Sequence, residues 1–304
     1  MSTHASLQDA LAQFVAREGL PDDYVATVQR WFLPLAEDIL QRVARSREAP
    51  IIGVSGCQGS GKTTLAALLV LLARELAGLR AVSLSIDDFY HTRDTRQRLA
   101  REVHPLFATR GVPGTHDVPL AIATLEALRS PGEVAIPRFD KAVDDRAPES
   151  AWPRLLAPVD LIVLEGWCLA VPPQPEAELQ APINELEVRE DAEGAWRRHV
   201  NRVLTEEYGA WYGMVDYLVM LRAPGFGKVR EWRGRQERKL AERAGSQGTR
   251  LMSEAELDRF IQHYERLTRH GLAVLPERAD VVFDLTDAQT IAGRATLQPA
   301  SRGE

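Results

Sequence analysis

The chain of 304 residues contains little cysteine and no long apolar run. Its two cysteines, Cys57 and Cys168, are too few for a disulfide framework and form no C-x-x-C motif. We therefore expect reduced thiols, as in a cytoplasmic protein. The longest apolar stretch, near Leu65–Ala73, is too short to cross a bilayer and indicates a buried helix. Because the N-terminal residues also lack the apolar core of a secretory signal, we expect a cytoplasmic location and no membrane partner.

Positive charge is in deficit as well. The chain has 37 Lys and Arg against 43 Asp and Glu, which gives a net charge of −6. Such a surface repels a phosphate backbone, so we expect no nucleic-acid partner. Hydrophobic residues make up 45% of the chain, enough for a large buried core. These bulk properties leave the oligomeric state open.

Short apolar runs alternate with amphipathic segments, which predicts an α/β fold with a mostly parallel β-sheet flanked by helices. The predicted strands are Ile51–Ser55, Ala81–Ile86, Leu161–Leu164, Tyr217–Leu221 and Val281–Leu285. The predicted helices are 63–77, 118–129, 194–208, 226–243 and 253–270. Residues 7–45 show helical spacing of their own. We therefore divide the chain into an N-terminal helical extension (1–47), an α/β domain (48–290) and a C-terminal tail (291–304).

The strongest motif is Gly56-Cys57-Gln58-Gly59-Ser60-Gly61-Lys62-Thr63, which fits G-x-x-x-x-G-K-[ST] without mismatch. An apolar strand precedes it and an apolar helix follows, which argues against a chance glycine turn. In a P-loop the glycines let backbone N–H groups face phosphates, and the lysine reaches the transferring phosphoryl group. The threonine hydroxyl binds Mg²⁺. The motif predicts that ATP is held by Gly56, Gln58, Gly59, Ser60, Gly61, Lys62, Thr63 and Thr64.

Two predicted strands end in acids, at the sheet edge where parallel sheets bind ligands. One strand runs into Asp87 and Asp88, and another runs into Glu165. Carboxylates beside a P-loop are suited to Mg²⁺ or to a proton from the acceptor hydroxyl. The alternative is an ordinary helix cap, a common role for aspartate after a strand. No [NT]-K-x-D segment follows the later strands, which weighs against a GTPase.

Together, these motifs resemble the phosphoribulokinase/uridine kinase family of P-loop kinases. A further segment, Arg110-Gly111-Val112-Pro113-Gly114-Thr115-His116-Asp117, resembles the plant-type D-glycerate 3-kinases and their bacterial and fungal relatives within that family. The likeness spans about residues 50–287. It includes Ser85–Tyr90, Gln97–Ala100, Ile136–Lys141, Asp145–Pro148, Leu164–Trp167, Trp196-Arg197, Val200-Asn201, Ala223-Pro224 and Trp232–Glu237.

The resemblance implies roles for particular residues. Asp87 matches the family's general base, and Glu165 matches the acid that helps Thr63 hold Mg²⁺. Some relatives have a tyrosine at the position of Phe139, so this chain lacks that hydroxyl. The resemblance also implies a P-loop kinase fold over 48–290 that uses ATP and Mg²⁺.

A small hydroxy-acid needs a cation for its carboxylate, and the arginine fork matches a carboxylate in two places. Arg110 lies in a loop bracketed by glycine and proline, which is the expected acceptor loop. For His116 the alternative is a structural turn histidine, and for Asp117 a helix N-cap is slightly favoured. The predicted acceptor-side residues are Asp87, Tyr90, Arg110, Thr115, His116, Lys141 and Arg146.

Residues 222–243 are rich in arginine and lysine. A charge run is usually a solvated helix face. Here it follows a strand ending in Ala223-Pro224, where kinases of this type carry a lid over the phosphates. We expect Arg230 or Arg233 to act there, and we place Arg233 with Lys62 and Asp87 among the catalytic residues.

The leading interpretation is a kinase that transfers the γ-phosphoryl group of ATP to a small metabolite, with D-glycerate as acceptor and 3-phosphoglycerate as product. A kinase for a nucleoside-like or pantothenate-like acceptor is the nearest alternative. Such an enzyme would need a roomier and more aromatic acceptor site than the charged loop at Arg110 suggests. A regulatory nucleotide-binding protein is the other, but no guanine reader or partner-facing segment supports it. The sequence does not fix the acceptor or the phosphorylated hydroxyl.

Overall fold

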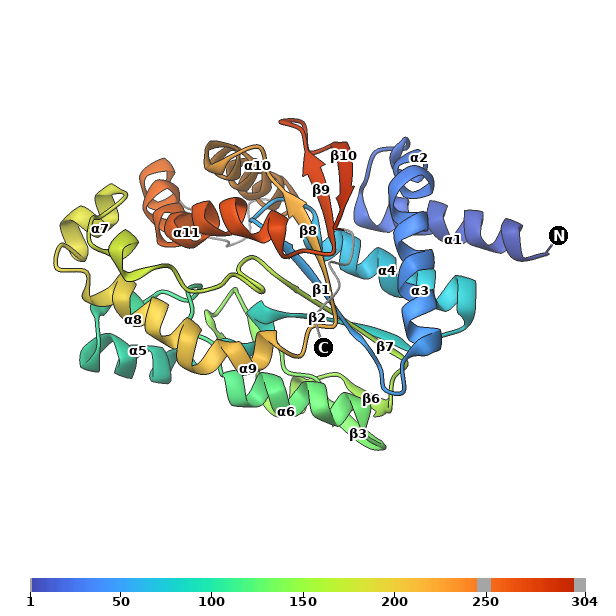
Figure 1. The fold of residues 1–304 in the computed structure, drawn as a ribbon, viewed down its shortest axis with the longest axis horizontal. Coiled ribbons are helices and arrows are strands. Elements are labelled where there is room, and N and C mark those ends of the chain that lie inside the picture. Colours follow the sequence, from blue (N-terminus) through green and yellow to red (C-terminus); the bar gives the residue numbers. More distant parts are fainter. Residues whose placement is uncertain (1, 245–252, 298–304) are drawn as a thin grey trace.

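The computed structural model describes residues 2–244 and 253–297, and its centre is a six-stranded sheet in the order β10-β9-β8-β1-β7-β2 (Figure 1). The strands β2, β7, β1, β8 and β9 pair in parallel, and β10 pairs with β9 in antiparallel orientation. This confirms the predicted α/β, mostly parallel architecture. The strands are β1 (Ile51–Gly56), β2 (Ala81–Ser85), β7 (Leu161–Gly166), β8 (Tyr217–Arg222), β9 (Val281–Leu285) and β10 (Ile291–Thr296).

Helices cover both faces of the sheet (Figure 1). Its central strands β1, β7 and β8 are therefore buried on both sides. One apolar cluster joins the sheet to α1, α3, α4 and α10, and the other joins it to α6, α8, α9 and α11. The helices are α1 (Ser2–Glu18), α2 (Tyr24–Thr27), α3 (Leu33–Arg45), α4 (Lys62–Ala77), α5 (Arg93–Glu102), α6 (Val118–Arg129), α7 (Glu185–Glu190), α8 (Ala195–Val203), α9 (Gly209–Tyr212), α10 (Phe226–Ala244) and α11 (Glu254–Val274).

Two small hairpin-like pairs lie outside the main sheet. β3 (Gly132–Ala135) pairs with β6 (Arg154–Ala157), and β4 (Phe139–Asp140) pairs with β5 (Asp145–Arg146). The β4–β5 hairpin belongs to the segment between α6 and β7, for which no element had been predicted. Its residues return to the carboxyl edge of the main sheet, where they meet the acids that follow β2.

Some predicted boundaries need correction. β2 ends at Ser85, because Ile86–Phe89 turns into a short 3₁₀ helix, and β7 continues through Glu165 to Gly166. The tail predicted from residue 291 is wrong in its first six residues, which form β10 on the edge of the sheet. Residues 298–304 of that tail lie outside the described residues. The division into an extension and a kinase domain stays a prediction.

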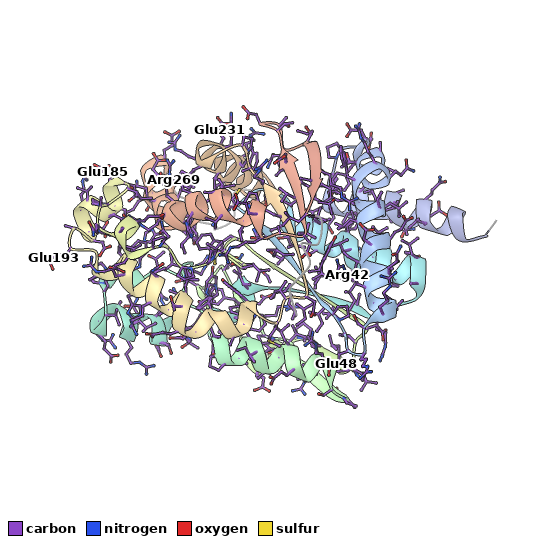
Figure 2. The ribbon with its side chains drawn as sticks, in the orientation of Figure 1. Arg42, Glu48, Glu185, Glu193, Glu231 and Arg269 are labelled. Atoms are coloured by element: carbon purple, nitrogen blue, oxygen red, sulfur yellow. The ribbon has the colours of Figure 1, made fainter. Side chains whose placement is uncertain are left out.

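The charged side chains Glu185, Glu193 and Glu231 lie at the periphery of the molecule, and each is exposed (Figure 2). Within the described ranges, every helix is too short or too polar to cross a membrane. The apolar side chains lie between the sheet and its helices instead.

The packing of the N-terminal helices predicts that they fold together with the sheet. Phe32 is 4% exposed, and its ring packs edge-on against Phe283 of β9 at 5.5 Å between centroids. Phe32→Ala should lower the free energy of unfolding by about 3–5 kcal/mol, because it leaves a cavity between the π-helical turn Val28–Phe32 and the sheet. Leu76→Ala, at a position 40% exposed, should cost less than about 1 kcal/mol. Urea denaturation measures both. If Phe32→Ala costs no more stability than Leu76→Ala, the N-terminal helices do not unfold together with the sheet.

Candidate active site

The P-loop joins β1 to α4. Gly59 and Gly61 have φ angles of +79° and +89°, a left-handed conformation that favours glycine, and the helix begins at Lys62. The loop closes on itself through the amide of Ser60, which donates to the carbonyl of Cys57 at 3.2 Å. The N-terminus of α4 therefore faces the loop, and its free N–H groups and partial positive charge suit an anionic phosphate.

Gly59 is also the point where α10 and the turn after β9 approach the P-loop. A Cβ atom built on Gly59 would lie 2.7 Å from Cβ of Trp232, so a side chain has no room there. The amide of Gln289 donates to the carbonyl of Gly59 at 2.5 Å. The P-loop is thus held from the side of α10, the helix predicted to form the lid.

Thr63 and Glu165 offer oxygen ligands suited to Mg²⁺. The Thr63 hydroxyl donates to Oε1 of Glu165 at 3.0 Å, and Lys62 Nζ lies 3.9 Å from Oε2. Oε2 is buried and has no hydrogen-bond partner, so this oxygen of the Glu165 carboxylate is available to a metal ion. Across the described residues no three His, Cys, Asp or Glu side chains form a metal cluster. One hydroxyl and one carboxylate nevertheless fit Mg²⁺ in a kinase, where phosphates and water supply the other ligands.

Asp87 follows β2, in the short 3₁₀ helix Ile86–Phe89. Its Oδ2 accepts a hydrogen bond from Lys141 Nζ at 2.6 Å, and its Oδ1 accepts one from the Tyr90 hydroxyl at 3.0 Å. Burial alone would raise the pKa of Asp87. The positive charges of Lys141 and Lys62 outweigh this effect and hold the pKa well below the usual carboxyl range. Asp87 is therefore ionised at neutral pH and is able to accept a hydrogen bond from an acceptor hydroxyl.

Asp88 bonds to the first strand of the β4–β5 hairpin and to the residue before it. It accepts hydrogen bonds from the backbone amide of Phe139 at 3.2 Å and from Arg138 at 3.3 Å. Burial raises the pKa of Asp88, against the opposing charge of Arg138. The two neighbouring acids therefore differ in their contacts: Asp88 ties down β4, and Asp87 meets the lysine of the hairpin turn.

The loop Arg110–Asp117 is held from within and from outside. Thr115 is fully buried, and its hydroxyl accepts from the Gly111 amide at 3.1 Å and donates to the Val112 carbonyl at 2.7 Å. Asp117 accepts from the amide of Leu120 and so caps α6, as its position had favoured. The hydroxyl of Thr115 therefore bonds to the backbone of its own loop.

His116 is buried between two aromatic residues. Its ring stacks on Tyr90 at 4.4 Å, and its Nδ1 lies 2.6 Å from the hydroxyl of Tyr208. Burial lowers the pKa of His116 to about 3, so the ring is neutral at physiological pH. These contacts match the structural alternative for His116. Its Nε2 is buried without a hydrogen-bond partner, and its predicted contact with the acceptor stays a prediction.

The β4–β5 hairpin brings charged residues to the acceptor side. Lys141 bonds to Asp87, and Arg146 donates to the carbonyl of Tyr90 and to Asp117, both at 2.9 Å. Arg110 pairs with Asp144, and its guanidinium lies over the ring of Phe139 at 5.4 Å. The structure therefore brings Asp87, Tyr90, Arg110, Lys141 and Arg146 into one network.

Comparison with known proteins agrees with this arrangement. The model of the phosphoribulokinase/uridine kinase family matches residues 51–172. The chloroplastic D-glycerate 3-kinase of Arabidopsis thaliana is 33% identical over 225 residues, which cover 70% of this chain and 46% of that protein. The uncharacterized kinase mug58 of Schizosaccharomyces pombe is 34% identical over 226 residues, which cover 70% of this chain and 78% of that protein.

The chain belongs to the phosphoribulokinase/uridine kinase family. The fold agrees with this assignment. A solved D-glycerate 3-kinase from Cryptococcus neoformans has a TM-score of 0.70 to this structure, at 22% identity and with coverage of 87% of this chain and 98% of that chain. The aligned region spans less than half of the Arabidopsis protein.

In this family member the two candidate lid arginines make different contacts. Arg230 pairs with Asp258 of α11 at 2.9 Å, whereas the guanidinium of Arg233 lies over the ring of Phe260 at 5.7 Å. The lid role of either residue stays a prediction. The side chains of residues 236–244 lie outside the described residues, so the arginines and lysine there have no structural account.

Three aromatic residues that hold the acceptor loop were missed from the sequence. The hydroxyl of Tyr264 donates to the carbonyl of Arg110 at 3.1 Å, and the indole of Trp167 donates to Gly111 at 3.1 Å. Tyr208 accepts from the amide of Gly114 at 3.1 Å. These partners lie far from the loop in sequence, and an aromatic residue on a helix or after a strand carries no local signal for such a contact.

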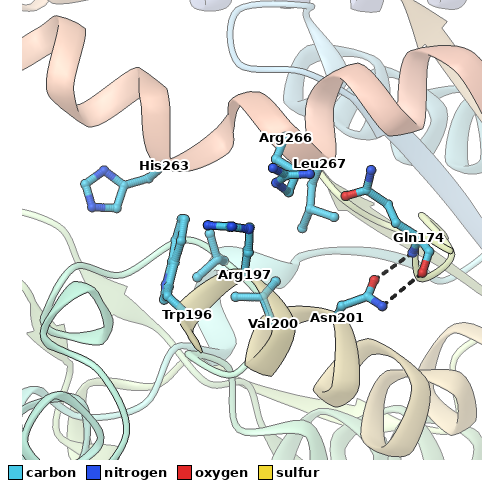
Figure 3. A pocket seen from close by; sticks show the side chains of 9 residues that line it. Gln174, Trp196, Arg197, Val200, Asn201, His263, Arg266 and Leu267 are labelled. Atoms are coloured by element: carbon cyan, nitrogen blue, oxygen red, sulfur yellow. Dashed lines mark hydrogen bonds between the residues drawn. The ribbon is translucent and has the colours of Figure 1, made fainter. Parts of the chain in front are cut away.

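A small cavity between α8 and α11 lies outside the set of predicted site residues (Figure 3). Two arginines line it, but both are used internally. Arg197 pairs with Asp191 at 3.0 Å, and Arg266 pairs with Glu187 at 2.6 Å. On the opposite side, Asn201 exchanges two hydrogen bonds with the backbone of Gln174. The cavity is therefore part of the junction that positions α11.

The geometry predicts that Glu165 carries the metal dependence. Glu165→Gln should raise the Mg²⁺ concentration needed for half-maximal ATP binding by at least about tenfold, because it removes a charged ligand beside Thr63. Asp88→Asn removes a charge at the same edge, from a residue already bonded to Arg138 and to β4. It should leave the Mg²⁺ requirement unchanged. Calorimetric titration of ATP at several Mg²⁺ concentrations measures this, and equal shifts in the two variants would refute the assignment.

Proposed function

We propose that this chain is an ATP- and Mg²⁺-dependent kinase that phosphorylates D-glycerate on its 3-hydroxyl. The products are ADP and 3-phosphoglycerate. The proposal is supported by the identity to the Arabidopsis D-glycerate 3-kinase and by the charges of the acceptor side. The acceptor is a small molecule, and no macromolecular partner is part of the proposal.

The nucleotide side supplies phosphate binding and charge stabilisation. The P-loop amides and Lys62 bind the β- and γ-phosphates, and Thr63 and Glu165 hold Mg²⁺. When bound, Mg²⁺ neutralises the charge that builds up on the phosphoryl oxygens. Arg233 would reach the phosphates from α10 when the nucleotide is bound. Closure of α10 would exclude water, so that ATP is not hydrolysed in place of transfer.

On the acceptor side, Asp87 receives the proton. The 3-hydroxyl oxygen forms a bond to the γ-phosphorus while the bond from that phosphorus to the bridging oxygen of ADP breaks. The hydroxyl proton passes to Oδ of Asp87. Its low pKa makes Asp87 a weak base toward a free alcohol. In a loose phosphoryl-transfer transition state, however, the hydroxyl becomes strongly acidic only as the bond to phosphorus forms, so the carboxylate first orients the hydroxyl and takes the proton late.

The observation that carries the choice of acceptor is the contact chain from Asp87 to Arg110. The Tyr90 hydroxyl bonds to Asp87 at 3.0 Å, and the Tyr90 ring packs edge-on against the ring of Phe139 at 5.3 Å between centroids. The guanidinium of Arg110 lies over that Phe139 ring at 5.4 Å. The proton acceptor Asp87 and the cation Arg110 are therefore linked through the side chains of Tyr90 and Phe139. A small molecule that carries both a hydroxyl and a carboxylate, such as glycerate, has a partner for each group in this chain of contacts.

Replacing Asp87 should separate its role from that of the metal ligand. Asp87→Asn should lower kcat by about 10²–10⁴-fold with little change in the KM for ATP, because the amide cannot accept the hydroxyl proton. The wild-type rate should show no loss from protonation of Asp87 between pH 8 and pH 5, since its pKa lies far below this range. Steady-state kinetics test both. If Asp87→Asn raises only the Mg²⁺ requirement, the roles of Asp87 and Glu165 must be exchanged.

The acceptor is tested by ADP release with D-glycerate, other hydroxy-acids, sugars, uridine and pantothenate. D-glycerate should give the highest kcat/KM, and phosphorus-coupled NMR of the product should show the ester at C3. Lys62→Ala serves as the inactive control for contaminating kinases, because it removes the cation that faces the γ-phosphate.

Arg110→Gln should then raise the KM for D-glycerate far more than that for ATP. Loss of charge-assisted hydrogen bonds worth about 1.5–3 kcal/mol corresponds to roughly 10- to 150-fold in KM. Arg110→Lys should also bind poorly, because an ammonium group cannot form the planar fork. Arg98→Gln, on the exposed face of α5, is the matched control. If another acceptor gives ADP release and D-glycerate does not, the assignment of D-glycerate as substrate is refuted, but the assignment as a kinase stands.

A further inference from the structure

Asp144 places a carboxylate of the protein where the proposed substrate would place its own. Its Oδ1 accepts from Nη1 of Arg110, and its Oδ2 accepts from Nη2 of Arg96 at 3.0 Å. Solvent reaches this pair, because the side chain of Arg110 is 22% exposed and that of Asp144 is 35% exposed. The cation that suits a substrate carboxylate is therefore already in contact with an internal carboxylate, at a position that small solutes can reach.

The backbone of Asp144 is anchored independently of its contact with Arg110. Arg96 is fully buried, and its guanidinium donates to the backbone carbonyls of Asp144 at 2.6 Å and Ala108 at 2.9 Å. The turn of the hairpin is thus held by main-chain oxygen atoms. The Asp144 carboxylate can leave Arg110 without releasing the hairpin.

The turn of the β4–β5 hairpin contacts both proposed partners of the acceptor, Asp87 and Arg110. Lys141, three residues before Asp144, bonds to Asp87 at 2.6 Å, and its side chain is 59% exposed. The proton acceptor and the carboxylate-binding cation are thus each paired with an oppositely charged residue of the same four-residue turn. An acceptor with one hydroxyl and one carboxylate would exchange with both contacts at once.

We infer that Asp144 is a specificity-determining residue that occupies Arg110 as an internal counter-ion and is displaced by the carboxylate of the acceptor. The inference rests on the proposed function, since it assumes an acid as the acceptor. Water competes for the partly exposed Arg110–Asp144 contact, so a second carboxylate can exchange with Asp144 there while its other oxygen stays on the buried Arg96. A neutral molecule of the same size has no group that replaces Asp144 on Arg110.

The cost of this competition can be expressed as a population. If the Arg110–Asp144 pair is closed about 80–90% of the time, the apparent Kd of the acid is about five- to tenfold higher than that of the open site. Removing the internal carboxylate should therefore tighten acid binding by about that factor. Neutral acceptors should gain nothing, because their binding does not depend on the cation.

The test is calorimetric binding of D-glycerate and of glycerol to the full chain with a non-hydrolysable ATP analogue and Mg²⁺. Asp144→Asn removes the charge and suits the φ of +56° at this position, which asparagine adopts readily. Asp140→Asn is the matched control, because Asp140 lies in the same hairpin and accepts only from the backbone amide of Ala142 among the contacts described. Melting temperatures show whether each variant is folded.

Asp144→Asn should lower the Kd for D-glycerate about five- to tenfold, with glycerol unchanged, and Asp140→Asn should lower neither. The gain should vanish in the double variant Arg110→Gln/Asp144→Asn, because the freed cation is then absent. An unchanged or higher Kd in folded Asp144→Asn would overturn the inference, and so would an equal gain in Asp140→Asn. Binding that follows the expected pattern without ADP release would overturn the proposed reaction alone.

A second variant covers the case in which Asp144→Asn is unfolded. Asp144→Gly keeps the carbonyl that accepts from Arg96 and suits the positive φ, while it removes the side chain altogether. It should show the same gain for D-glycerate. Absence of D-glycerate binding in the wild type and in both Asp144 variants would overturn the inference.

Discussion

The parallel pairing of β1 with β7 is the constraint on which the candidate site depends. Their register sets Val54 beside Glu165 and Ser55 beside Gly166, so β1 enters the P-loop where β7 presents its carboxylate. From this register follow the 3.0 Å hydrogen bond between Thr63 and Glu165 and the proximity of Lys62. β2 pairs with the other edge of β7 and delivers Asp87 just beyond the same line. A shift of one residue would turn the Glu165 side chain to the opposite face of the sheet.

The acceptor side depends on a second set of contacts, which are buried hydrogen bonds between distant elements. α11 is fixed to α7 by the buried pair Arg266–Glu187, and it brings the Tyr264 hydroxyl to the carbonyl of Arg110. Tyr208 holds the other end of that loop through Gly114 and His116. Because α11 also meets α10 through the Arg230–Asp258 pair, the acceptor loop and the predicted lid share one support. These contacts therefore connect α10 through α11 to the backbone of Arg110.

What could be predicted from the sequence was local. The P-loop, the strands around it and the helix cap at Asp117 each follow from a few consecutive residues, and the structure has them at those positions. The β4–β5 hairpin was not predicted, because each of its strands has only two residues and alternation cannot be read over such a length. Asp144 and Tyr264 were missed for a different reason. They contact Arg110 across 34 and 154 residues of sequence, and nothing in their neighbours marks that partner.

Charge balance explains why these missed contacts matter for function. The sequence predicts Arg110, Lys141 and Arg146 as cations for an acidic acceptor. In the structure each of them is paired with an acid, namely Asp144, Asp87 and Asp117. A free cation at a partly buried position would be costly, so a site that binds an acid must neutralise its own charge while the acid is absent. The binding of a small acid is then an exchange of one carboxylate for another, and its free energy is a difference between two similar pairs. Selectivity in such a site follows from how weakly the internal partner is held as much as from how well the substrate fits.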